Sequence, residues 1–440
     1  MKDSMKVQKR LRQLWVLVMM LSLTACARPG TQMADKIYFV ASGHEGAQIW
    51  RMNVDGIDPS VVYEVYSSSN RPANVVLPKE ELALLEGFLT SITPTLTSEQ
   101  VYLTPQIERL RLSPNKQKLA WIESDFGCNT LGARIGCFGS ERINSLDQST
   151  NAKLTYWQSS AHQLEEPHLA VPGIESLVWS PDSRHIAFAH RADRNVPCLP
   201  ALRVIDTDSQ NIQDIGVGGT LLTWSPDGHN LASADCGNQG IIIRIYNLEN
   251  NTKREFAIEN LDLAGHSISW SSQTDQIAFA ATSNEYPKAN RASLYTLDTK
   301  NGNVQKILEA DNESYENPQW SPDGHLIAFD SRPEIGDLYM GLSVVNPESK
   351  AMIAQLPVER VDQSWKWNLD SKSILVLLGN HTGSQSLGIL RIETSALTPI
   401  PLPQVIQKSL PSTANTTPYF RSFVDSPKDT SILRIDQPHW

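Results

Sequence analysis

Residues 318–331 have the sequence PQWSPDGHLIAFDS, and variants of this phrase recur along the chain. The other two strong copies are LVWSPDSRHIAFAH at residues 177–190 and LTWSPDGHNLASAD at residues 222–235. Weaker copies begin at Leu110, Ile268 and Trp365. Successive tryptophans of the phrase lie 45, 46, 50 and 47 residues apart, in the series Trp179, Trp224, Trp270, Trp320 and Trp367. A period in this range indicates a propeller or a solenoid array.

Each copy predicts a β-hairpin. An apolar strand ends at Trp, Ser-Pro-Asp-Gly turns the chain, and a short apolar strand such as residues 327–329 returns. Proline presets the backbone of the first central turn position, and glycine accepts the left-handed backbone that follows. Most copies continue with a third strand that ends in a polar turn, as at residues 202–206, 243–247 and 293–298. Four strands per period without helical spacing predict the blades of an all-β propeller.

The phrase resembles the repeat of TolB-type propellers, which are relatives of WD-type propellers. The resemblance covers roughly residues 37–398. It implies the fold and no particular function, because one fold supports many functions. The separate N-terminal α/β domain of TolB is not expected here, since a short stretch alone separates Cys26 from the first strand expected at Ile37. The role of TolB itself is therefore not transferred.

The two ends of the chain predict how the ring closes. Residues 37–40 resemble the returning strand of a repeat, and residues 48–52 resemble its third strand. The ending Gln-Pro-His-Trp at residues 437–440 resembles the strand that leads into a repeat's Trp. One blade is therefore expected to be shared between the N- and C-termini, within a single propeller domain at 37–440. Six phrases and one shared blade predict seven four-stranded blades, with six or eight as alternatives.

Residues 1–25 are predicted to be a lipoprotein signal peptide. Basic residues precede an apolar stretch at residues 14–23, which is too short to remain as a membrane span. The sequence Leu-Thr-Ala-Cys at residues 23–26 resembles a bacterial lipobox, which implies a lipid anchor on Cys26; the alternative is a secretory signal with a chance cysteine. Residues 26–36 then form the lipidated cysteine and a tether, whose last ten residues reach at most about 35 Å.

The charge of the chain argues against nucleic acid as a partner. The full sequence has a formal net charge of −10, and cleavage after residue 25 leaves 33 basic and 47 acidic residues, or about −14. Such a surface repels nucleic acid and anionic lipid headgroups. Membrane attachment is therefore expected through the lipid. The expected location is the outer membrane facing the periplasm in a Gram-negative cell, and the cell surface otherwise.

Besides Cys26 the chain has four cysteines, and an even number in an exported protein predicts two disulfides. Cys128 and Cys137 flank a Gly-rich loop of one blade. Cys198 and Cys236 follow matching strands of neighbouring blades, so that a bond between blades is expected there. A zinc site is the alternative, but no CxxC spacing or Cys/His cluster supports it.

Two insertions interrupt the regular period. Residues 78–92 combine a leading proline, acidic residues and spaced apolar residues, which predicts an amphipathic helix. This helix either packs on its own blade or docks a partner. The second insertion lengthens the blade at residues 112–172 and contains the loop between Cys128 and Cys137.

No catalytic residue, metal ligand or cofactor is predicted. Residues 265–269 resemble a nucleophile elbow superficially, but the final glycine is missing and a strand follows. Residues 53–58 have oxygen donors at calcium-loop spacing but lack the bidentate glutamate. His229 and His325 are expected to be exposed turn residues. The repeated tryptophans are assigned to blade packing rather than to sugar stacking.

The favoured hypothesis is a lipid-anchored, extracytoplasmic propeller that acts as a protein-binding scaffold in the bacterial cell envelope. The alternative is a small-ligand or carbohydrate-binding or carbohydrate-active propeller with its site at the central channel. That alternative requires charged side chains that converge at the channel. The residues before the tryptophans in four copies are mostly apolar or neutral, which disfavours it: Leu177-Val178, Leu222-Thr223, Ser267-Ile268 and Pro318-Gln319.

Overall fold

In a computed structural model of the chain, the described residues form β-strands and the turns and short connections between them. The described residues are 36–43, 46–66, 104–131, 134–159, 162–164, 173–191, 200–237, 240–284, 291–311, 313–332, 340–361, 365–379, 385–400 and 434–439. Across these ranges, no helix is long and apolar enough to cross a membrane. The strands form seven antiparallel sheets, which are the blades of a β-propeller.

From the innermost strand outward, each blade has four strands in its main order. Blade 1 contains β29 (Arg434–His439), β1 (Lys36–Gly43), β2 (Gly46–Asn53) and β3 (Ser60–Tyr66). Blade 2 contains β4 (Thr104–Leu112), β5 (Lys118–Leu131), β6 (Arg134–Asp147) and β7 (Lys153–Gln158), and β8 (His162–Leu164) also pairs with β6. Blade 3 contains β9 (Gly173–Trp179), β10 (His185–Arg191), β11 (Ala201–Asp206) and β12 (Ile212–Val217).

The remaining blades follow in chain order. Blade 4 contains β13 (Leu221–Trp224), β14 (Asn230–Gly237), β15 (Gly240–Asn247) and β16 (Thr252–Glu259). Blade 5 contains β17 (Leu261–Trp270), β18 (Gln276–Ser283), β19 (Ser293–Asp298) and β20 (Val304–Leu308). Blade 6 contains β21 (Ser314–Trp320), β22 (Ile327–Arg332), β23 (Met340–Val345) and β24 (Met352–Val361). Blade 7 contains β25 (Trp365–Trp367), β26 (Ser373–Gly379), β27 (Gln385–Arg391) and β28 (Ala396–Ile400).

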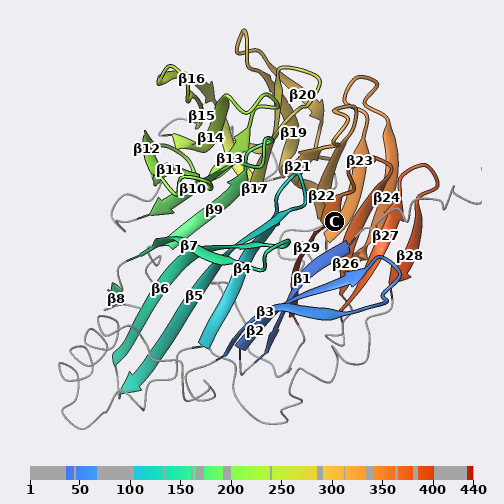
Figure 1. The fold of residues 1–440 in the computed structure, drawn as a ribbon. Helices are drawn as coiled ribbons and strands as arrows, with labels where there is room; N and C mark the ends of the chain where they lie inside the picture. Colours follow the sequence, from blue (N-terminus) through green and yellow to red (C-terminus); the bar gives the residue numbers. More distant parts are fainter. Residues whose placement is uncertain are drawn as a thin grey trace, which may run out of the picture. The chain divides into compact units, whose positions relative to one another are not determined.

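The blade shared between the two ends of the chain is confirmed. The C-terminal strand β29 pairs antiparallel with β1, and Figure 1 shows the two strands, red and blue, beside each other. His439 lies opposite Tyr38, as Val178 lies opposite Ala187 in blade 3. His439 therefore holds the register position that precedes the Trp of the repeat, and Trp440 follows it in the sequence.

The hydrophobic core lies between blades. In the part of the chain that the structure describes, each of the seven junctions between neighbouring blades contains one cluster of buried apolar side chains. The junction of blades 7 and 1, for example, packs Ile37 and Phe39 of β1 against Leu375 and Leu377 of β26. Since blade 1 packs on both blade 7 and blade 2, the clusters form an uninterrupted ring.

The Ser-Pro-Asp-Gly turns are built as the sequence predicts. In blade 3 the Ser180 hydroxyl donates to Asp182, and the Asp182 carboxylate accepts the Arg184 N–H at 2.9 Å. The residue in the glycine position has a left-handed backbone, with φ of 63° at Ser183 and 71° at Gly324. Burial alone would raise the pKa of Asp182, but these hydrogen bonds lower it overall. The polar residues of the phrase are therefore used inside the turn.

The repeated tryptophans connect neighbouring blades. The indole Nε1–H of Trp179 donates to the carbonyl of Arg111 on the preceding innermost strand, at 3.3 Å. Trp224 donates in the same way to Val178 at 3.3 Å, and Trp367 donates to the carbonyl of Gln319 at 3.2 Å. The assignment of these residues to blade building is thereby supported for three blades.

Replacing these tryptophans by phenylalanine is expected to separate hydrogen bonding from packing. Trp179→Phe leaves the Arg111 carbonyl without the indole donor, which should cost about 1–2 kcal/mol beyond the loss of ring area. Trp320→Phe is the matched control, because the described part of the structure gives its Nε1–H no partner. Urea unfolding of both variants measures the difference. Equal losses would contradict a role for the indole hydrogen bond.

The blade at residues 112–172 is longer than the others, as predicted. The prediction of a Gly-rich loop between Cys128 and Cys137 is wrong. β5 and β6 are each 14 residues long, and Cys128 lies opposite Cys137 in their continuous pairing. The insertion is thus an extended hairpin, because each strand satisfies the backbone groups of the other beyond the blade. The helix predicted at residues 78–92 lies outside the described residues.

Candidate functional site

Three of the innermost strands that the structure describes combine a register shift with a positive backbone φ. The pairing of β4 with β5, of β17 with β18 and of β21 with β22 shifts register, and a residue with positive φ lies within each shift. These residues are Arg109 (50°), Gly265 (75°) and Asn317 (52°). Positive φ is uncommon for residues other than glycine, and bulges redirect side chains near functional sites.

The bulges of blades 5 and 6 lie against each other. A Cβ atom on Gly265 would lie 2.8 Å from Oδ1 of Asn317, so glycine is required for this close approach. The backbone N–H of His266 donates to the same Oδ1 atom, and the Asn317 side chain donates to Asp330 at 2.7 Å. The stretch that superficially resembled a nucleophile elbow, residues 265–269, is therefore part of a strand bulge.

Glu141 on β6 is held against the start of blade 3. Its carboxyl accepts the N–H of Ile174 at 2.6 Å, and a Cβ atom on Gly173 would lie 3.0 Å from it. Burial raises the pKa of Glu141 to about 8, against the lowering effect of the Ile174 N–H. The charge of Arg109 also acts on Glu141, and burial lowers the pKa of Arg109. Glu141 is therefore mainly neutral at pH 7.

Arg111 and Lys366 bring two cations onto innermost strands. Arg111 lies on β4, one residue before the position that Trp occupies in the strong copies, and Lys366 lies on β25, directly before Trp367. Burial, followed by the charge of Arg111, lowers the pKa of Lys366 to about 7, although the charge of Asp330 opposes both effects. Burial, followed by the charge of Arg109, lowers the pKa of Arg111 to about 10. The cations therefore form one electrostatically connected group.

Asp330 is the carboxylate next to this group. It lies on β22, is 1% exposed, and accepts hydrogen bonds from Asn317 and, at 2.6 Å, from the indole of Trp365. Burial raises the pKa of Asp330 to about 6, although both hydrogen bonds lower it. We call Arg109, Arg111, Glu141, Asp330 and Lys366 the inner-strand cluster.

The inner-strand cluster was not expected from the sequence. The residues before the tryptophans were expected to be mostly apolar or neutral, and this holds for the four copies on which the expectation was based. Two of the weaker copies, those that begin at Leu110 and Trp365, place Arg111 and Lys366 at that position. The signal was present in the sequence, but Leu112 in place of Trp made the first weak copy less visible.

Chemically, the inner-strand cluster is suited to binding an anion. It combines guanidinium and ammonium donors with a neutral carboxyl group in a partly buried setting, where electrostatic attraction is stronger than in water. Among the side chains that the structure describes, no group of three or more His, Cys, Asp or Glu could hold a metal ion.

The site residues predicted from the sequence are only partly within the described chain. Cys26 and Cys198 lie outside it. The backbone register places Cys128 opposite Cys137, and Cys236 on β14 opposite Ile241. Opposed residues of antiparallel strands have Cα atoms about 4.5–5.5 Å apart, which suits a disulfide. Both disulfides, Cys128–Cys137 and Cys198–Cys236, stay predictions, since their sulfur atoms lie outside the described part.

The turn at residues 53–58 uses its oxygen donors locally. The carboxylate of Asp55 accepts the N–H of Ile57 at 2.9 Å, and the Asn53 amide donates to Asp58 at 3.3 Å. His229 is an exposed turn residue, as expected, and its Nδ1 lies 2.8 Å from Glu249.

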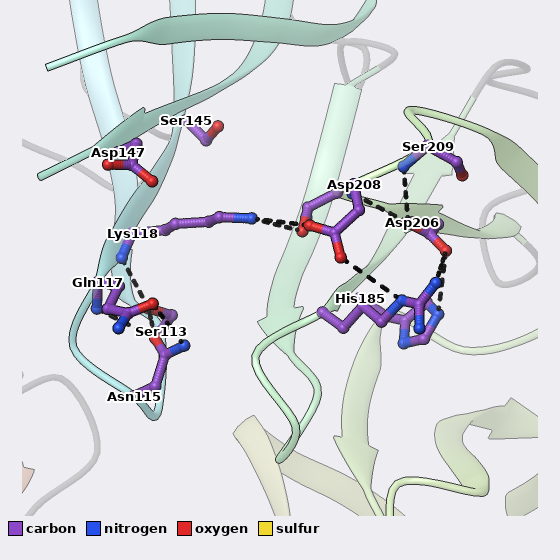
Figure 2. Close-up of polar contacts among 12 residues, drawn as sticks. Ser113, Asn115, Gln117, Lys118, Ser145, Asp147, His185, Asp206, Asp208 and Ser209 are labelled. Atoms are coloured by element: carbon purple, nitrogen blue, oxygen red, sulfur yellow. Dashed lines mark hydrogen bonds and ion pairs between the residues drawn. The ribbon is translucent and has the colours of Figure 1, made fainter. Parts of the chain in front are cut away.

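A second polar group joins the turns of blades 2 and 3. Figure 2 shows Lys118 pointing toward Asp208 of the next blade, with an Nζ–Oδ1 distance of 3.3 Å. Arg184 lies 3.3 Å from Asp206, and the His185 ring lies 3.8 Å from the same carboxylate. Asp208 is 62% exposed, and exposed ion pairs contribute little stability. This group is a surface contact between blades.

Comparisons with known proteins return propellers among the solved structures. TolB from Acinetobacter baumannii is 13% identical, with a TM-score of 0.44 over 83% of this chain and 79% of that one. An oligogalacturonate lyase in complex with manganese is 12% identical, with a TM-score of 0.46 over 67% and 83%. A prolyl endopeptidase is 12% identical, with a TM-score of 0.49 over 84% of this chain and 48% of that one.

These likenesses concern the fold alone, because the identities are low and the neighbours include proteins of different activity. No family model and no curated protein matches the sequence. Evidence for the function therefore comes from this chain's own residues.

Glu141→Gln is expected to change how stability depends on pH. The folded-state pKa of about 8 exceeds the ordinary 4.5, so the carboxyl contributes stability that is lost as pH rises from about 4.5 through 8. The glutamine variant stays neutral. Its free energy of unfolding, relative to that of the native chain, should therefore rise by on the order of 2 kcal/mol from pH 5 to pH 9. Urea unfolding at both pH values measures this.

Two features make that comparison interpretable. Lys366 has a lowered pKa, so its contribution to stability is lost in the opposite direction, as pH decreases from 10.5 through 7. This contribution is the same in the variant and in the native chain, so it cancels when their stabilities are compared. Glu259→Gln, at an exposed carboxylate on β16, is the control, because Glu259 is not among the charges that act on Glu141. Parallel stability curves for Glu141→Gln and the native chain would contradict the buried, neutral carboxyl.

Proposed function

We propose that this protein is a lipid-anchored, extracytoplasmic β-propeller that binds a protein partner in the bacterial cell envelope, and that it acts by binding rather than by catalysis. One observation carries the proposal: the residues of the repeated phrase form hydrogen bonds that build the blades. Turn residues such as Ser180 and Asp182 bond to each other, and indoles such as that of Trp224 bond to the preceding blade. The result is a rigid framework, on which the side chains that vary between blades offer a preorganised binding surface.

The proposed anchoring rests on the sequence. The basic and apolar segments of residues 1–25 and the lipobox-like residues 23–26 support lipidation of Cys26. The negative charge expected after cleavage favours attachment through lipid over attachment through basic residues. Cys26→Ala should therefore move the protein from the membrane fraction to the soluble fraction, and should abolish incorporation of an alkyne-labelled palmitate.

Crosslinking in the organism of origin tests partner binding. The full chain carries a C-terminal affinity tag, membranes are treated with a short amine-reactive crosslinker, and captured proteins are identified by mass spectrometry. Reproducible capture of envelope proteins is the expected result. The control is a tagged lipoprotein of similar abundance, which accounts for proteins captured through proximity alone. Capture of the same set by both proteins would overturn the scaffold proposal.

A second candidate function is binding of a small ligand or carbohydrate at the central channel. The inner-strand cluster favours it, since charged side chains with shifted pKa values, such as Arg111 and Lys366 on innermost strands, are typical of ligand sites. Native mass spectrometry of the purified protein separates the two candidates. A reproducible bound small molecule without an envelope partner would support this second function in place of the first.

A further inference from the structure

Asp330 on β22 connects the innermost strands of three consecutive blades. Its Oδ2 atom accepts a hydrogen bond at 2.7 Å from the side-chain amide of Asn317 on β21, in its own blade. Its Oδ1 atom accepts the indole N–H of Trp365 on β25, in blade 7, at 2.6 Å. The Oδ1 atom of Asn317 in turn accepts the backbone N–H of His266 on β17, in blade 5. We call these four residues the Asp330 network.

Every hydrogen bond of the Asp330 network is directed toward the carboxylate. The backbone N–H of His266 and the indole N–H of Trp365 can only donate. Because the N–H of His266 occupies the side-chain oxygen of Asn317, the NH2 group of Asn317 faces Asp330. An ionised carboxylate has two accepting oxygens and no donor. Each contact therefore joins one donor to one acceptor while Asp330 is ionised.

Protonation of Asp330 adds one hydrogen more than these contacts can hold. A proton on Oδ1 opposes the indole of Trp365, and a proton on Oδ2 opposes the amide of Asn317. Rotation of the Asn317 amide would offer its oxygen to that proton, but would turn its NH2 group against the N–H of His266. Because Asp330 is 1% exposed, the proton cannot turn toward bulk water instead. One of the three contacts is therefore weakened or lost when Asp330 is neutral.

The contact at His266 lies where the bulges of two innermost strands meet. Gly265 and Asn317 have positive φ, and each lies within a register shift of its strand. A Cβ atom on Gly265 would lie 2.9 Å from the backbone nitrogen of Asn317, so the two backbones approach closely here. Nearer the repeat's Trp, the hydroxyl of Ser269 accepts the N–H of Trp320 at 3.0 Å. Loss of the His266 contact should therefore free the bulges while the Trp ends of the strands stay joined.

We propose that the Asp330 network is a proton-sensitive latch, which connects the bulges of blades 5 and 6 to blade 7 while Asp330 is ionised and releases one of these connections when Asp330 is protonated. The latch acts on innermost strands, so its release changes the surface that these strands present toward the axis of the propeller. It does not depend on whether that surface binds a protein or a small ligand.

The charged groups around Asp330 allow it to titrate near neutral pH. Burial raises the pKa of Asp330 to about 6, its two hydrogen bonds lower it, Glu316 raises it and Arg332 lowers it. Glu316 on β21 and Arg332 on β22 lie 3.3 Å apart. On β25 the charged neighbour is Lys366, whose pKa Asp330 raises. On β17 the titratable neighbour is the exposed side chain of His266.

The effect of pH on stability distinguishes release of the latch from acid unfolding. The folded-state pKa of about 6 exceeds the ordinary 3.8, so Asp330 contributes stability that is present below 3.8 and is lost as pH rises through 6. Protonation therefore stabilises the whole fold by removing a buried charge, although it weakens a local contact. Release at pH 5 should accordingly be confined to blades 5–7.

Nuclear magnetic resonance of the purified full chain, with its tryptophan indoles labelled with nitrogen-15, tests the protonation step. The indole signal of Trp365 is assigned by its absence in Trp365→Phe. It should move between pH 5 and pH 8 with a midpoint of about 6, whereas the signal of Trp224, which donates to a backbone carbonyl, should stay in place. Asp330→Asn should abolish the movement. His266→Gln and Lys366→Met remove the other titratable groups nearby and should retain it.

Hydrogen exchange of β17 tests the release. Asp330→Asn keeps the shape of the side chain but leaves one accepting oxygen, so this variant imitates the protonated latch at every pH. At pH 7 the amides of β17 should exchange about three- to tenfold faster in Asp330→Asn than in the native chain, and at pH 5 the two rates should agree. The amides of β10, in blade 3, are the control and should exchange equally in both proteins.

Two results would overturn the proposal. One is a Trp365 signal that stays in place from pH 5 to pH 8, or that moves equally in Asp330→Asn. The other is β17 exchange that is the same at pH 7 in Asp330→Asn and in the native chain. If Asp330→Asn does not fold, the native chain decides through the protection of β17 at pH 5 and pH 7, corrected for the intrinsic exchange rate at each pH. Equal protection at the two pH values would then overturn the latch.

Discussion

Glu123→Ala should destabilise the propeller by about 3–5 kcal/mol, because it removes one partner from a buried ionic network. Glu123 on β5 is 4% exposed. Its carboxylate accepts hydrogen bonds from the hydroxyl of Tyr63 at 2.7 Å, from Arg142 at 2.8 Å and from Asn144 at 3.1 Å. The ammonium of Lys153 lies 3.4 Å from it. Alanine would leave these donors facing a void.

The loss of stability in Glu123→Ala should be large because the ionic network around Glu123 joins two blades. Tyr63 lies on β3 of blade 1, whereas Glu123 and Lys153 lie on blade 2. The Lys153 ammonium also lies 4.4 Å from the centre of the Tyr63 ring, and that ring lies 4.8 Å from the ring of buried Trp121. Blade 1 is the blade that β29 completes, so the network supports the junction next to the point of ring closure.

The pH dependence provides an independent check. Burial alone would raise the pKa of Glu123, but the charge of Lys153, the hydroxyl of Tyr63 and Arg142 lower it overall. The carboxylate therefore contributes stability above its ordinary pKa of 4.5, which is lost as pH falls through the lowered value. Urea unfolding of Glu123→Gln should show less of this acid-induced loss than the native chain.

Tyr63→Phe is the matched control for the alanine variant. It keeps the ring that packs on Trp121 and removes a single hydroxyl, so its cost should be about 1–2 kcal/mol. A loss of less than about 1 kcal/mol for Glu123→Ala would show that the ionic network does not stabilise the junction.

The sequence predicted the blades because their turns are local. Ser-Pro-Asp-Gly and its variants specify a hairpin through φ preferences and side-chain bonds within a few residues, as at Asp323 and Gly324. The ring closure was also predictable, since residues 37–40 and 437–440 each resemble part of one repeat. Both features depend on short segments that repeat a known pattern.

The inner-strand cluster could not be predicted in the same way. The positive φ of Arg109 and Asn317 arises from bulges, which depend on how two strands pair rather than on either sequence alone. The shifted pKa of Glu141 depends on the start of the next blade. The extended hairpin around Cys128 was missed because its Gly-rich sequence lacks strand alternation, and pairing between the two strands compensates for this.

Removing residues 434–440 should open the ring. β29 supplies the innermost strand of blade 1, and its pairing runs from Arg434 opposite Ser42 to His439 opposite Tyr38. β1 contains Ile37 and Phe39, which are fully buried between blades 7 and 1. Without β29, the inner backbone edge of β1 lacks partners and these side chains become accessible to water. The loss of stability should be about 3–6 kcal/mol, from about 1.5–3 kcal/mol for each of these two side chains uncovered.

Thermal unfolding and hydrogen exchange measure this effect. The truncated chain should unfold about 4–7 °C below the native chain, and the amides of β1 should exchange much faster, because a partnerless edge opens locally. Gln163→Pro is the control. It disrupts the pairing of β8 with β6, which lies outside the main strand order of blade 2 and takes no part in ring closure. Its midpoint should fall by about 1 °C at most. A truncated chain that unfolds as cooperatively as the native one, at a midpoint close to that of Gln163→Pro, would show that β29 does not close the propeller.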